Sequence, residues 1–368
     1  MNVPLPFDLG VLAQQAFERV VNEDLKRVNL IIAGRSGVGK STLVNAVFQG
    51  NFAETGQGRP VTQTTTEYTK EGLPLAILDT RGLELERYQD TLASLEALLE
   101  ERRGERDLER QVHVAWICVS EESRRVEAGE TRLAELFARF QIPAVAVITK
   151  ARSDQGFRDT VRALLPTARN VARVRALAEV EDDGHALAPQ GLAELIELTS
   201  TLVPEAQKTA FAAVQRVNLA LKRARAQRYV VAAATAAATI GAVPIPFADA
   251  IALVPVQVGM LAGISVAFGL PVGPGFLSTL IGSSFVGLAG TLGGRAIVSG
   301  LLKLVPGAGS VLGGAIAATT AAVLTTTFGE LYLAVLGRLF ESNGGEAPPA
   351  SAVQAAFAEA VRQQVSPG

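Results

Sequence analysis

The stretch that decides the fold is Gly34-Arg35-Ser36-Gly37-Val38-Gly39-Lys40-Ser41, which fits the pattern GxxxxGK[ST]. It follows an apolar run at residues 28–33 and precedes a segment with helical periodicity. Glycines in such a loop let backbone N–H groups turn toward phosphate oxygens, while the lysine reaches the β- and γ-phosphates and the hydroxyl ligates Mg²⁺. The predicted nucleotide-binding residues of this loop are Ser36, Gly37, Val38, Gly39, Lys40, Ser41 and Thr42.

A second phosphate-linked motif lies at residues 75–82, where an apolar run ends in Asp79-Thr80-Arg81-Gly82, the pattern DxxG. We predict that Asp79 holds Mg²⁺ through water and that the Gly82 amide meets a γ-phosphate. Arg81 is a candidate for stabilising charge during catalysis, and the alternative is a solvated loop arginine. Ser41 and Asp79 are therefore predicted metal ligands.

A hydroxyl-rich loop at residues 59–66 separates the two motifs. A phosphate-sensing loop places one threonine on Mg²⁺, and several threonines compete for that role here. Thr62 is the first choice, as metal ligand and catalytic residue, and Thr65 is the second because alternation from Thr65 to Lys70 suits a strand. The alternative is a threonine-rich edge strand without a ligand.

Apolar runs at residues 28–33, 75–78, 112–119 and 144–148 are predicted to form strands, each followed by helical periodicity. This alternation is typical of a parallel α/β sheet with helices on both faces. We therefore expect a doubly wound, mainly parallel α/β domain at residues 1–205, including an N-terminal helix.

The run Gly39-Lys40-Ser41-Thr42-Leu43-Val44-Asn45-Ala46-Val47-Phe48-Gln49-Gly50 matches GKSTLxNxxxxG. With the order of the other motifs over residues 26–205, it resembles the Era, septin and dynamin-like branch of P-loop GTPases. The resemblance implies a G domain that binds GTP with Mg²⁺ as cofactor and hydrolyses it to GDP and phosphate.

Members of this family read guanine with the motif [NT]KxD, and here Thr149-Lys150-Ala151-Arg152 stands in that place. The resemblance implies that Thr149 and Lys150 bind nucleotide, with the Lys150 stem over the purine. Arg152 occupies the position of the aspartate, so Asp154 is the predicted substitute if the loop bulges. Guanine is the expected base, with adenine or a relaxed site as the alternative. The amide of Ala178 is predicted to touch the base oxygen, unless residues 176–178 simply end a strand.

The residue after DxxG is Leu83, where Ras-like members hold a glutamine that orients the attacking water. A leucine side chain has no group to orient water. The resemblance to dimerising dynamin-like GTPases implies that a switch loop or a second subunit supplies the missing group. We therefore expect slow intrinsic hydrolysis and a homo-oligomer in the GTP state.

The second half of the chain is almost free of charge, with no charged side chain between Asp249 and Arg295. We expect an apolar helical domain at residues 206–340, and then a linker and short helix at 341–368. The expected helices cover about residues 206–241, 247–269, 276–303, 308–339 and 351–364.

Two interpretations compete for the apolar helices: membrane insertion, or a soluble bundle that buries its own apolar faces. The uncharged composition favours membrane contact, since the helices offer little polar outer face. Arg295 and Lys303 would lie on the far side of a four-span arrangement, which favours shallow or conditional insertion, or two hairpins, over four fixed spans. Immunity-related and dynamin-like GTPases share this plan of a G domain with a lipid-acting helical half.

The whole-chain properties limit the remaining classes of function. A length of 368 residues suits two domains, and a net charge of −2 with pI 5.9 argues against nucleic acid as a partner. The lone Cys118 forms no internal disulfide, and the first thirty residues lack the apolar core of a signal peptide. We expect a membrane-associated GTPase on the cytoplasmic face of the inner membrane, with a soluble cytoplasmic state as the alternative. The alternative functions are a transporter gated by the G domain and a soluble scaffold that binds nucleotide with little turnover.

Overall fold

The computed structural model describes residues 9–50, 57–60, 62, 65–80, 88–104, 108–181, 184–241, 249–270, 273–281 and 314–365. The chain divides into two compact units. We call residues 26–218 the α/β unit, and residues 1–25 with 219–368 the helical unit.

A seven-stranded sheet in the order β2-β3-β4-β1-β5-β6-β7 forms the centre of the α/β unit. β1 pairs in parallel with β4 and β5, and β6 and β7 continue the parallel side, whereas β2 and β3 are antiparallel. The strands are β1 Val28–Ala33, β2 Gln57–Pro60, β3 Thr65–Thr69, β4 Leu75–Thr80, β5 Val114–Ser120, β6 Ala144–Thr149 and β7 Asn170–Arg173. The four strands predicted from apolar runs are all present, and the mainly parallel fold class is confirmed.

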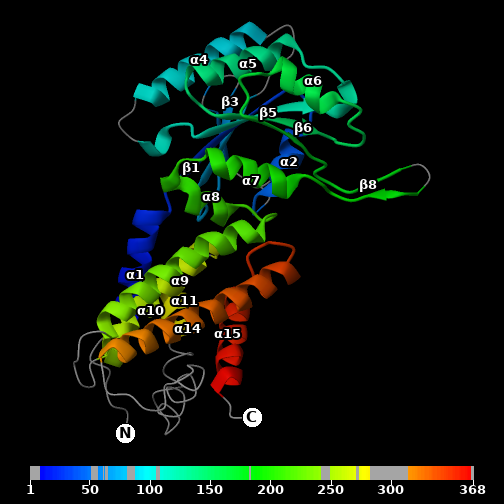
Figure 1. The fold of residues 1–368 in the computed structure, drawn as a ribbon. Helices are drawn as coiled ribbons and strands as arrows, with labels where there is room; N and C mark the ends of the chain where they lie inside the picture. Colours follow the sequence, from blue (N-terminus) through cyan, green and yellow to red (C-terminus); the bar gives the residue numbers. More distant parts are fainter. Residues whose placement is uncertain are drawn as a thin grey trace. The chain divides into compact units, whose positions relative to one another are not determined.

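Helices cover both faces of this sheet (Figure 1). On one face α4 Tyr88–Gly104, α5 Ala128–Arg139 and α6 Phe157–Leu164 enclose a continuous apolar core. On the other lie α2 Lys40–Val47, α7 Leu192–Leu202 and α8 Lys208–Val214. There Trp116 stacks on Phe48 with ring centroids 5.7 Å apart, and its Nε1 donates to Thr199 Oγ1 at 3.0 Å. The short elements are η1 Leu108–Arg110, η2 Glu121–Ser123, β8 Glu179–Val180, β9 Ala186–Leu187 and η3 Glu205–Gln207.

The single helix expected over residues 206–241 is wrong, because α8 ends at Val214 and α9 spans Leu219–Gly241. Gln215 makes the break: its side-chain Oε1 accepts the N–H groups of Val217 at 3.0 Å and of Asn218 at 2.8 Å. The N–H of Arg216 then donates to Val47 O at 2.9 Å, at the end of α2. The α/β unit therefore extends to Asn218, beyond the expected boundary at 205.

The helical unit contains α1 Leu9–Asp24, α9, α10 Asp249–Phe268, α11 Pro274–Ile281, α14 Gly314–Ser342 and α15 Ala350–Val365. α10 and α15 match the helices expected at 247–269 and 351–364. The helices expected at 276–303 and 308–339 overlap α11 and α14. Residues 282–313, which belong to these two expected helices and the turn between them, lie outside the described part of the chain. α1 was expected in the G domain, but it buries Ala13 and Val20 in the core of the helical unit, and the Tyr229 hydroxyl donates to Asp24 Oδ2 at 2.8 Å.

α9 packs antiparallel to both α10 and α14, and close glycine contacts permit this packing. A Cβ at Gly263 of α10 would lie 2.1 Å from the Tyr229 ring of α9, and one at Gly329 of α14 would lie 2.8 Å from Val230. The hydroxyls of Ser265 and Tyr332 lie 2.7 Å apart and link α10 to α14. The described helices therefore bury much of their apolar surface against one another.

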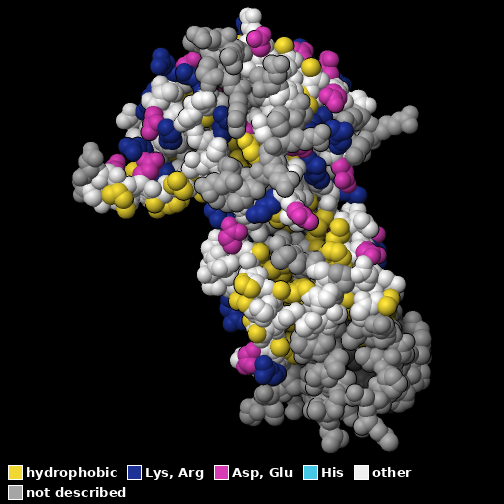
Figure 2. Space-filling view, turned by 180° about the vertical axis from the view of Figure 1, so that it is seen from behind, with side chains coloured by type: hydrophobic (Ala, Val, Ile, Leu, Met, Phe, Trp, Pro, Cys, Tyr) yellow, Lys and Arg dark blue, Asp and Glu magenta, His cyan; other side chains and the backbone are white. Residues whose placement is uncertain are grey.

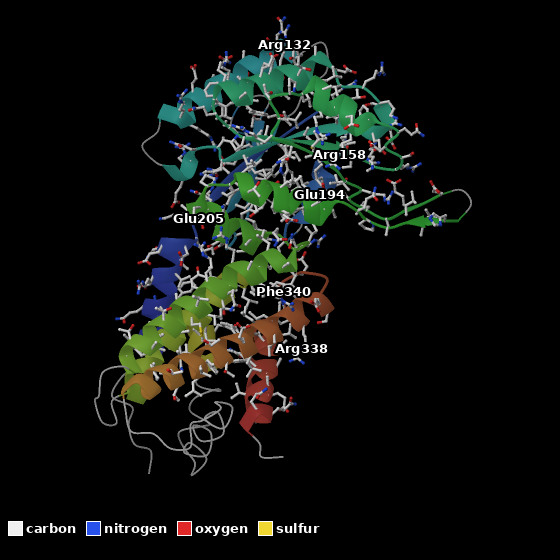
Figure 3. All side chains as sticks on the ribbon, in the orientation of Figure 1. Arg132, Arg158, Glu194, Glu205, Arg338 and Phe340 are labelled. Atoms are coloured by element: carbon white, nitrogen blue, oxygen red, sulfur yellow. The ribbon has the colours of Figure 1, made fainter. Side chains whose placement is uncertain are left out.

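One lysine, Lys222 of α9, is fully buried in this apolar core. Its Nζ donates to Phe268 O, at the end of α10, at 2.9 Å, and lies 5.4 Å from the ring centroid of Phe340, which Figure 3 labels on α14. Burial lowers the pKa of Lys222 well below its ordinary value, and the charge of Glu346 opposes this only in part. The neutral amine is therefore favoured more in the folded chain than in the unfolded one.

This lowered pKa predicts that the stability of the helical unit rises with pH toward the ordinary lysine pKa. The unfolded chain binds the Lys222 proton more tightly than the folded chain, so acidification from pH 10.5 down to the lowered pKa of the folded state favours unfolding. The slope reaches at most about 1.4 kcal/mol per pH unit for one proton. Denaturant unfolding from pH 7 to pH 10 should show a shallower slope for Lys222→Met than for the parent chain. Arg223→Met, at the exposed neighbouring position, should keep the parent slope.

Candidate nucleotide-binding site

The predicted phosphate loop connects β1 to α2, and its glycines adopt backbone angles that other residues rarely take. Gly34 has φ +152° and Gly39, directly before α2, has φ +98°. A Cβ at Gly34 would lie 2.6 Å from the carbonyl oxygen of Cys118 on β5. The loop is thus shaped by glycine, and it leads into the helix N-terminus, whose free N–H groups suit an anion.

Lys40 and Asp79, predicted from separate motifs, meet in the structure. The Lys40 Nζ donates to Gly34 O at 2.7 Å and to Arg35 O at 3.2 Å, and lies 4.0 Å from Asp79 Oδ1. Pairing of Asp79 with Ile32 across β4 and β1 places the carboxylate beside the start of the loop. The two side chains are only 10% and 13% exposed, so their charges act in a poorly solvated place.

The residues available for a Mg²⁺ ion have the chemistry that this ion prefers. Ser41 lies in the first turn of α2 and offers a hydroxyl, and Asp79 offers a carboxylate at the end of β4. Mg²⁺ binds hard oxygen ligands, keeps several waters and uses one or two protein groups with the phosphates of a nucleotide. Ser41 and Asp79 fit this description.

The two candidate threonines occupy different environments. Thr62 is partly exposed, and its Oγ1 accepts the N–H of Thr65 at 2.9 Å. Thr65 is buried at the start of β3, opposite Thr80 of β4. Thr62 is therefore the more accessible of the two, and its role on Mg²⁺ stays a prediction. The predicted catalytic residues Arg81 and Gly82, and Leu83 after them, lie outside the described residues.

The expected base-reading loop begins at the end of β6 and is tied to the phosphate loop. Thr149 Oγ1 donates to Val38 O at 2.6 Å and contacts Val119 O at 3.2 Å. Lys150 has φ +53° and its Nζ lies 2.8 Å from Glu122 Oε2. Both predicted residues thus lie at the same edge of the sheet as the phosphate loop.

Glu121, which no sequence motif indicated, holds this loop in place through hydrogen bonds to its backbone. Its buried carboxylate accepts the N–H of Ser153 at 2.9 Å and also the N–H of Arg152, while the Arg173 Nε donates to Oε1 at 2.8 Å. In the sequence, the signal that could have indicated this role is the presence of acidic residues directly after an apolar strand. Glu121 therefore fixes the path of residues 152–153.

Asp154 lies just before α6, which begins at Phe157. Its Oδ1 accepts the N–H of Arg158 at 2.8 Å and lies 3.5 Å from the Arg173 Nε. The Arg158 guanidinium reaches Glu194 of α7 at 3.2 Å, and Figure 3 labels both of these residues. The carboxylate of Asp154 thus stabilises the N-terminus of α6, and its predicted contact with a base stays a prediction.

Arg152, at the position of the family's aspartate, forms an ion pair with Glu179. The Arg152 Nε and Nη2 lie 2.8 and 2.7 Å from Glu179 Oε2. Glu179 begins β8 directly after Ala178, which is exposed. The ion pair of Arg152 with Glu179 thus lies next to residues predicted for base contact on both loops.

Comparison with known proteins agrees with this fold and motif order. Residues 29–150 match the family model described as 50S ribosome-binding GTPase. Among curated proteins, the chain is similar to the ribosome biogenesis GTPase A of Bacillus cereus, with 33% identity over 87 residues, or 23% of this chain and 29% of that protein. The protein of the same name from Bacillus licheniformis is 34% identical over 97 residues, or 26% of this chain and 34% of that protein. The chain thus spans about a third of the length of these relatives.

Solved structures give similar matches at lower identity. A probable GTP-binding protein engB is 16% identical with a TM-score of 0.31, covering 40% of this chain and 89% of that chain. Toc33 from Arabidopsis thaliana in complex with GDP and Mg²⁺ is 17% identical with a TM-score of 0.33, covering 55% of this chain and 91% of that chain. The family match of residues 29–150 is to GTPases, and the helical unit lies outside that match.

Proposed function

We propose that this protein binds GTP with Mg²⁺ at residues 34–42 and hydrolyses it to GDP and phosphate. The observation that carries the proposal is the placement of Lys40 between the carbonyl of Gly34 and the carboxylate of Asp79. The match of residues 29–150 to a family of GTPases supports it. Calorimetric titration of the full chain with Mg²⁺ and GTP, GDP or ATP tests the proposal, and binding of the guanine nucleotides is the expected result.

The residues of the site would share the work of phosphate binding. Backbone N–H groups at the start of α2 hold phosphate oxygens, and Lys40 brings positive charge to the β- and γ-phosphates. Ser41, Thr62 and Asp79 are the residues that would hold Mg²⁺, which when bound neutralises charge on the phosphates. Gly82 and Arg81 remain the proposed contacts to the γ-phosphate and to developing charge.

We also propose that the GTP state self-associates, as the resemblance to dynamin-like and immunity-related GTPases implies. Leu83 cannot orient a water molecule, so an efficient reaction needs a group from elsewhere. A second copy of the chain is the proposed source of that group. Mixing wild-type chain with an Arg81→Ala chain should lower the activity per wild-type molecule if the group comes from the partner.

The helical unit supports a proposal of membrane contact because its charge is distributed unevenly along its length. α9 carries Lys222, Arg223, Arg225 and Arg228 in its first half, and residues 229–241 have no charged side chain. Because α14 runs antiparallel, its uncharged first half, residues 314–328, lies beside this part of α9. Residues 229–241 and 314–328, which we call the uncharged end, thus carry no charged side chain, although α10 begins beside them at Asp249.

The uncharged end also exposes little polarity. Val231 is 59% exposed, and the exposed Thr235 and Thr239 donate their hydroxyls to Val231 O at 2.9 Å and to Thr235 O at 3.0 Å. These threonines therefore offer mainly methyl groups to the surroundings. Figure 2 shows hydrophobic side chains gathered on the helical unit, whereas charged side chains are denser on the α/β unit.

We propose that this uncharged end contacts the cytoplasmic face of the inner membrane, with a soluble cytoplasmic protein as the alternative. Among the described helices, the segment Thr319–Ser342 of α14 has the length and hydropathy of a membrane-crossing helix, and half of its apolar window is buried inside the protein. A core helix of a soluble bundle meets the same criteria. The proposal is therefore surface contact or shallow insertion, supported by the uncharged end and not by that segment alone.

A charge at the uncharged end should weaken binding to lipid. Val231→Glu places a carboxylate on an exposed position, so the fold should persist, and we expect liposome affinity to fall by about 10-fold or more. Flotation with vesicles of anionic phospholipid measures it, with Val231→Thr as the isosteric control. Gly263 is unsuitable for this test because the Tyr229 ring covers it. Equal flotation of Val231→Glu and the parent chain, or no flotation of the parent in any nucleotide state, would contradict membrane contact at this end.

The description of the matching family as ribosome-binding does not lead us to propose a ribosomal partner. The match covers residues 29–150 only, and the chain spans about a third of the relatives that carry such names. A net charge of −2 also gives no general attraction to a polyanion. We propose guanine nucleotide, lipid and a second copy of the chain as partners, and no nucleic acid.

A further inference from the structure

We propose that Glu179, held in place by Arg152, is the carboxylate that reads the purine base. The inference rests on the proposed binding of GTP and names the group that gives this site its base preference. It assigns Glu179 a contact with the base and Arg152 the role of a positioning residue.

The chemistry of guanine demands an acceptor at this edge of the site. Guanine presents the N1–H and the exocyclic amine side by side, and a carboxylate can accept from both. Arginine carries donors only, so Arg152 itself cannot make this contact. It can, however, orient a neighbouring carboxylate, because its guanidinium is planar and always charged.

Glu179 and Arg152 come from two loops that the fold brings together. Arg152 follows β6, and Glu179 follows the loop after β7. The Ala151 N–H donates to Val174 O at 3.1 Å, and the Arg175 Nη1 donates to Ala151 O at 2.8 Å. These bonds join the loops at the carboxyl ends of neighbouring parallel strands, where ligands bind in open α/β sheets.

The ion pair leaves one oxygen of Glu179 available. Both Arg152 contacts, at 2.8 and 2.7 Å, are made to Oε2. Oε1 accepts no hydrogen bond from any residue in the described ranges, and the side chain is 28% exposed. Glu179 thus combines a fixed carboxylate with an unused acceptor.

The other acidic side chains of the region make different contacts, although Asp154 and Glu122, like Glu179, each keep one oxygen that accepts no hydrogen bond from the described residues, and Glu181 lies exposed after β8. Glu121 accepts the loop N–H groups of residues 152 and 153, and Asp154 accepts the Arg158 N–H at the start of α6. Glu122 pairs with Lys150 at 2.8 Å and is more exposed than Glu179. Among the described acidic residues, Glu179 is the one paired with Arg152, the residue at the position of the aspartate in the base-reading motif, and this pairing favours Glu179 for the base.

The test compares GTP with xanthosine triphosphate, which carries a carbonyl where guanine carries the amine. Glu179→Gln replaces one carboxylate oxygen with a donor, so we expect affinity for GTP to fall by about 10- to 100-fold and the preference to move toward xanthosine triphosphate. Glu122→Gln is the matched control and should leave the ratio of the two affinities unchanged. Calorimetry on the full chain with Mg²⁺ gives both affinities.

The positioning role of Arg152 has its own readout. Arg152→Ala should reduce the preference for GTP over xanthosine triphosphate, and Arg152→Lys should restore part of it. The double variant Arg152→Asp with Glu179→Arg exchanges the charges and returns the carboxylate to the position that the family motif uses. We expect that variant to prefer GTP more strongly than Glu179→Gln does.

Two results would overturn this inference while leaving the proposed function intact. One is an unchanged ratio in Glu179→Gln that still binds GTP, and the other is a shift of the ratio in Asp154→Asn but not in Glu179→Gln, which would make Asp154 the base-reading residue. If the parent chain binds neither nucleotide, the proposed function itself fails and the inference fails with it.

Discussion

Replacement of Lys40 by alanine is expected to lower the affinity for GTP by about 10²- to 10³-fold, because it removes a poorly solvated charge that the phosphates would meet. In the structure the Lys40 Nζ folds back onto Gly34 O and Arg35 O and faces Asp79 at 4.0 Å. No other residue of the loop from Gly34 to Ser41 ends in an ammonium group. Calorimetric titration of the full chain with GTP and Mg²⁺ measures the loss.

The control for this variant is Lys26→Ala, which removes an exposed lysine of the same unit that pairs with Glu109 at 3.4 Å. Its GTP affinity should equal that of the parent chain. Circular dichroism should show that Lys40→Ala keeps its fold, since the aliphatic stem is not part of the apolar core. A folded Lys40→Ala chain with unchanged GTP affinity would exclude residues 34–42 as the nucleotide site.

The second large effect concerns the rate of hydrolysis. We expect a slow intrinsic rate that rises by about 10³-fold when a partner group stabilises the transition state, since Leu83 replaces the water-orienting glutamine of Ras-like enzymes. Phosphate release from GTP should therefore increase per molecule as protein concentration rises, or when anionic liposomes are added. The measurement is steady-state phosphate release over a wide range of protein concentrations, with and without lipid.

An opposite pattern would show that the chain carries a complete catalytic site by itself. Turnover at about 1 s⁻¹ by a monomer, independent of concentration and lipid, would be that pattern. Light scattering on the same samples tells whether the active species is a monomer. Arg81→Ala then tests whether the arginine of DxxG takes part in either case.

The features that sequence patterns predicted are those whose physical cause is local. The phosphate loop needs glycine at Gly34 and Gly39 because of their backbone angles. It also needs a strand before it and a helix after it. Each of these requirements is visible in a short stretch of the sequence. Buried parallel strands such as β5 and β6 leave continuous apolar runs. Sequence order and spacing then placed Asp79 near Lys40, which the register of β1 and β4 shows directly.

The features that escaped prediction depend on contacts between distant segments. Glu121 and Glu179 look like ordinary surface acids in the sequence, and their roles appear only when the fold brings them to Arg173 and Arg152. The break at Gln215 depends on a side-chain amide that replaces helix hydrogen bonds, which composition does not reveal. α1 packs against α10 and α11, but its amphipathic pattern fits many partners and did not indicate these two helices.

The central claim is that the loop at residues 34–42 hydrolyses GTP. Single-turnover phosphate release from GTP, measured with excess full-length protein and Mg²⁺ beside the Lys40→Ala chain under the same conditions, tests it most directly. The account predicts release by the parent chain, on a slow time course, and none above the uncatalysed rate by Lys40→Ala. Equal release by the two chains, or release by neither at any protein concentration with liposomes present, would contradict it.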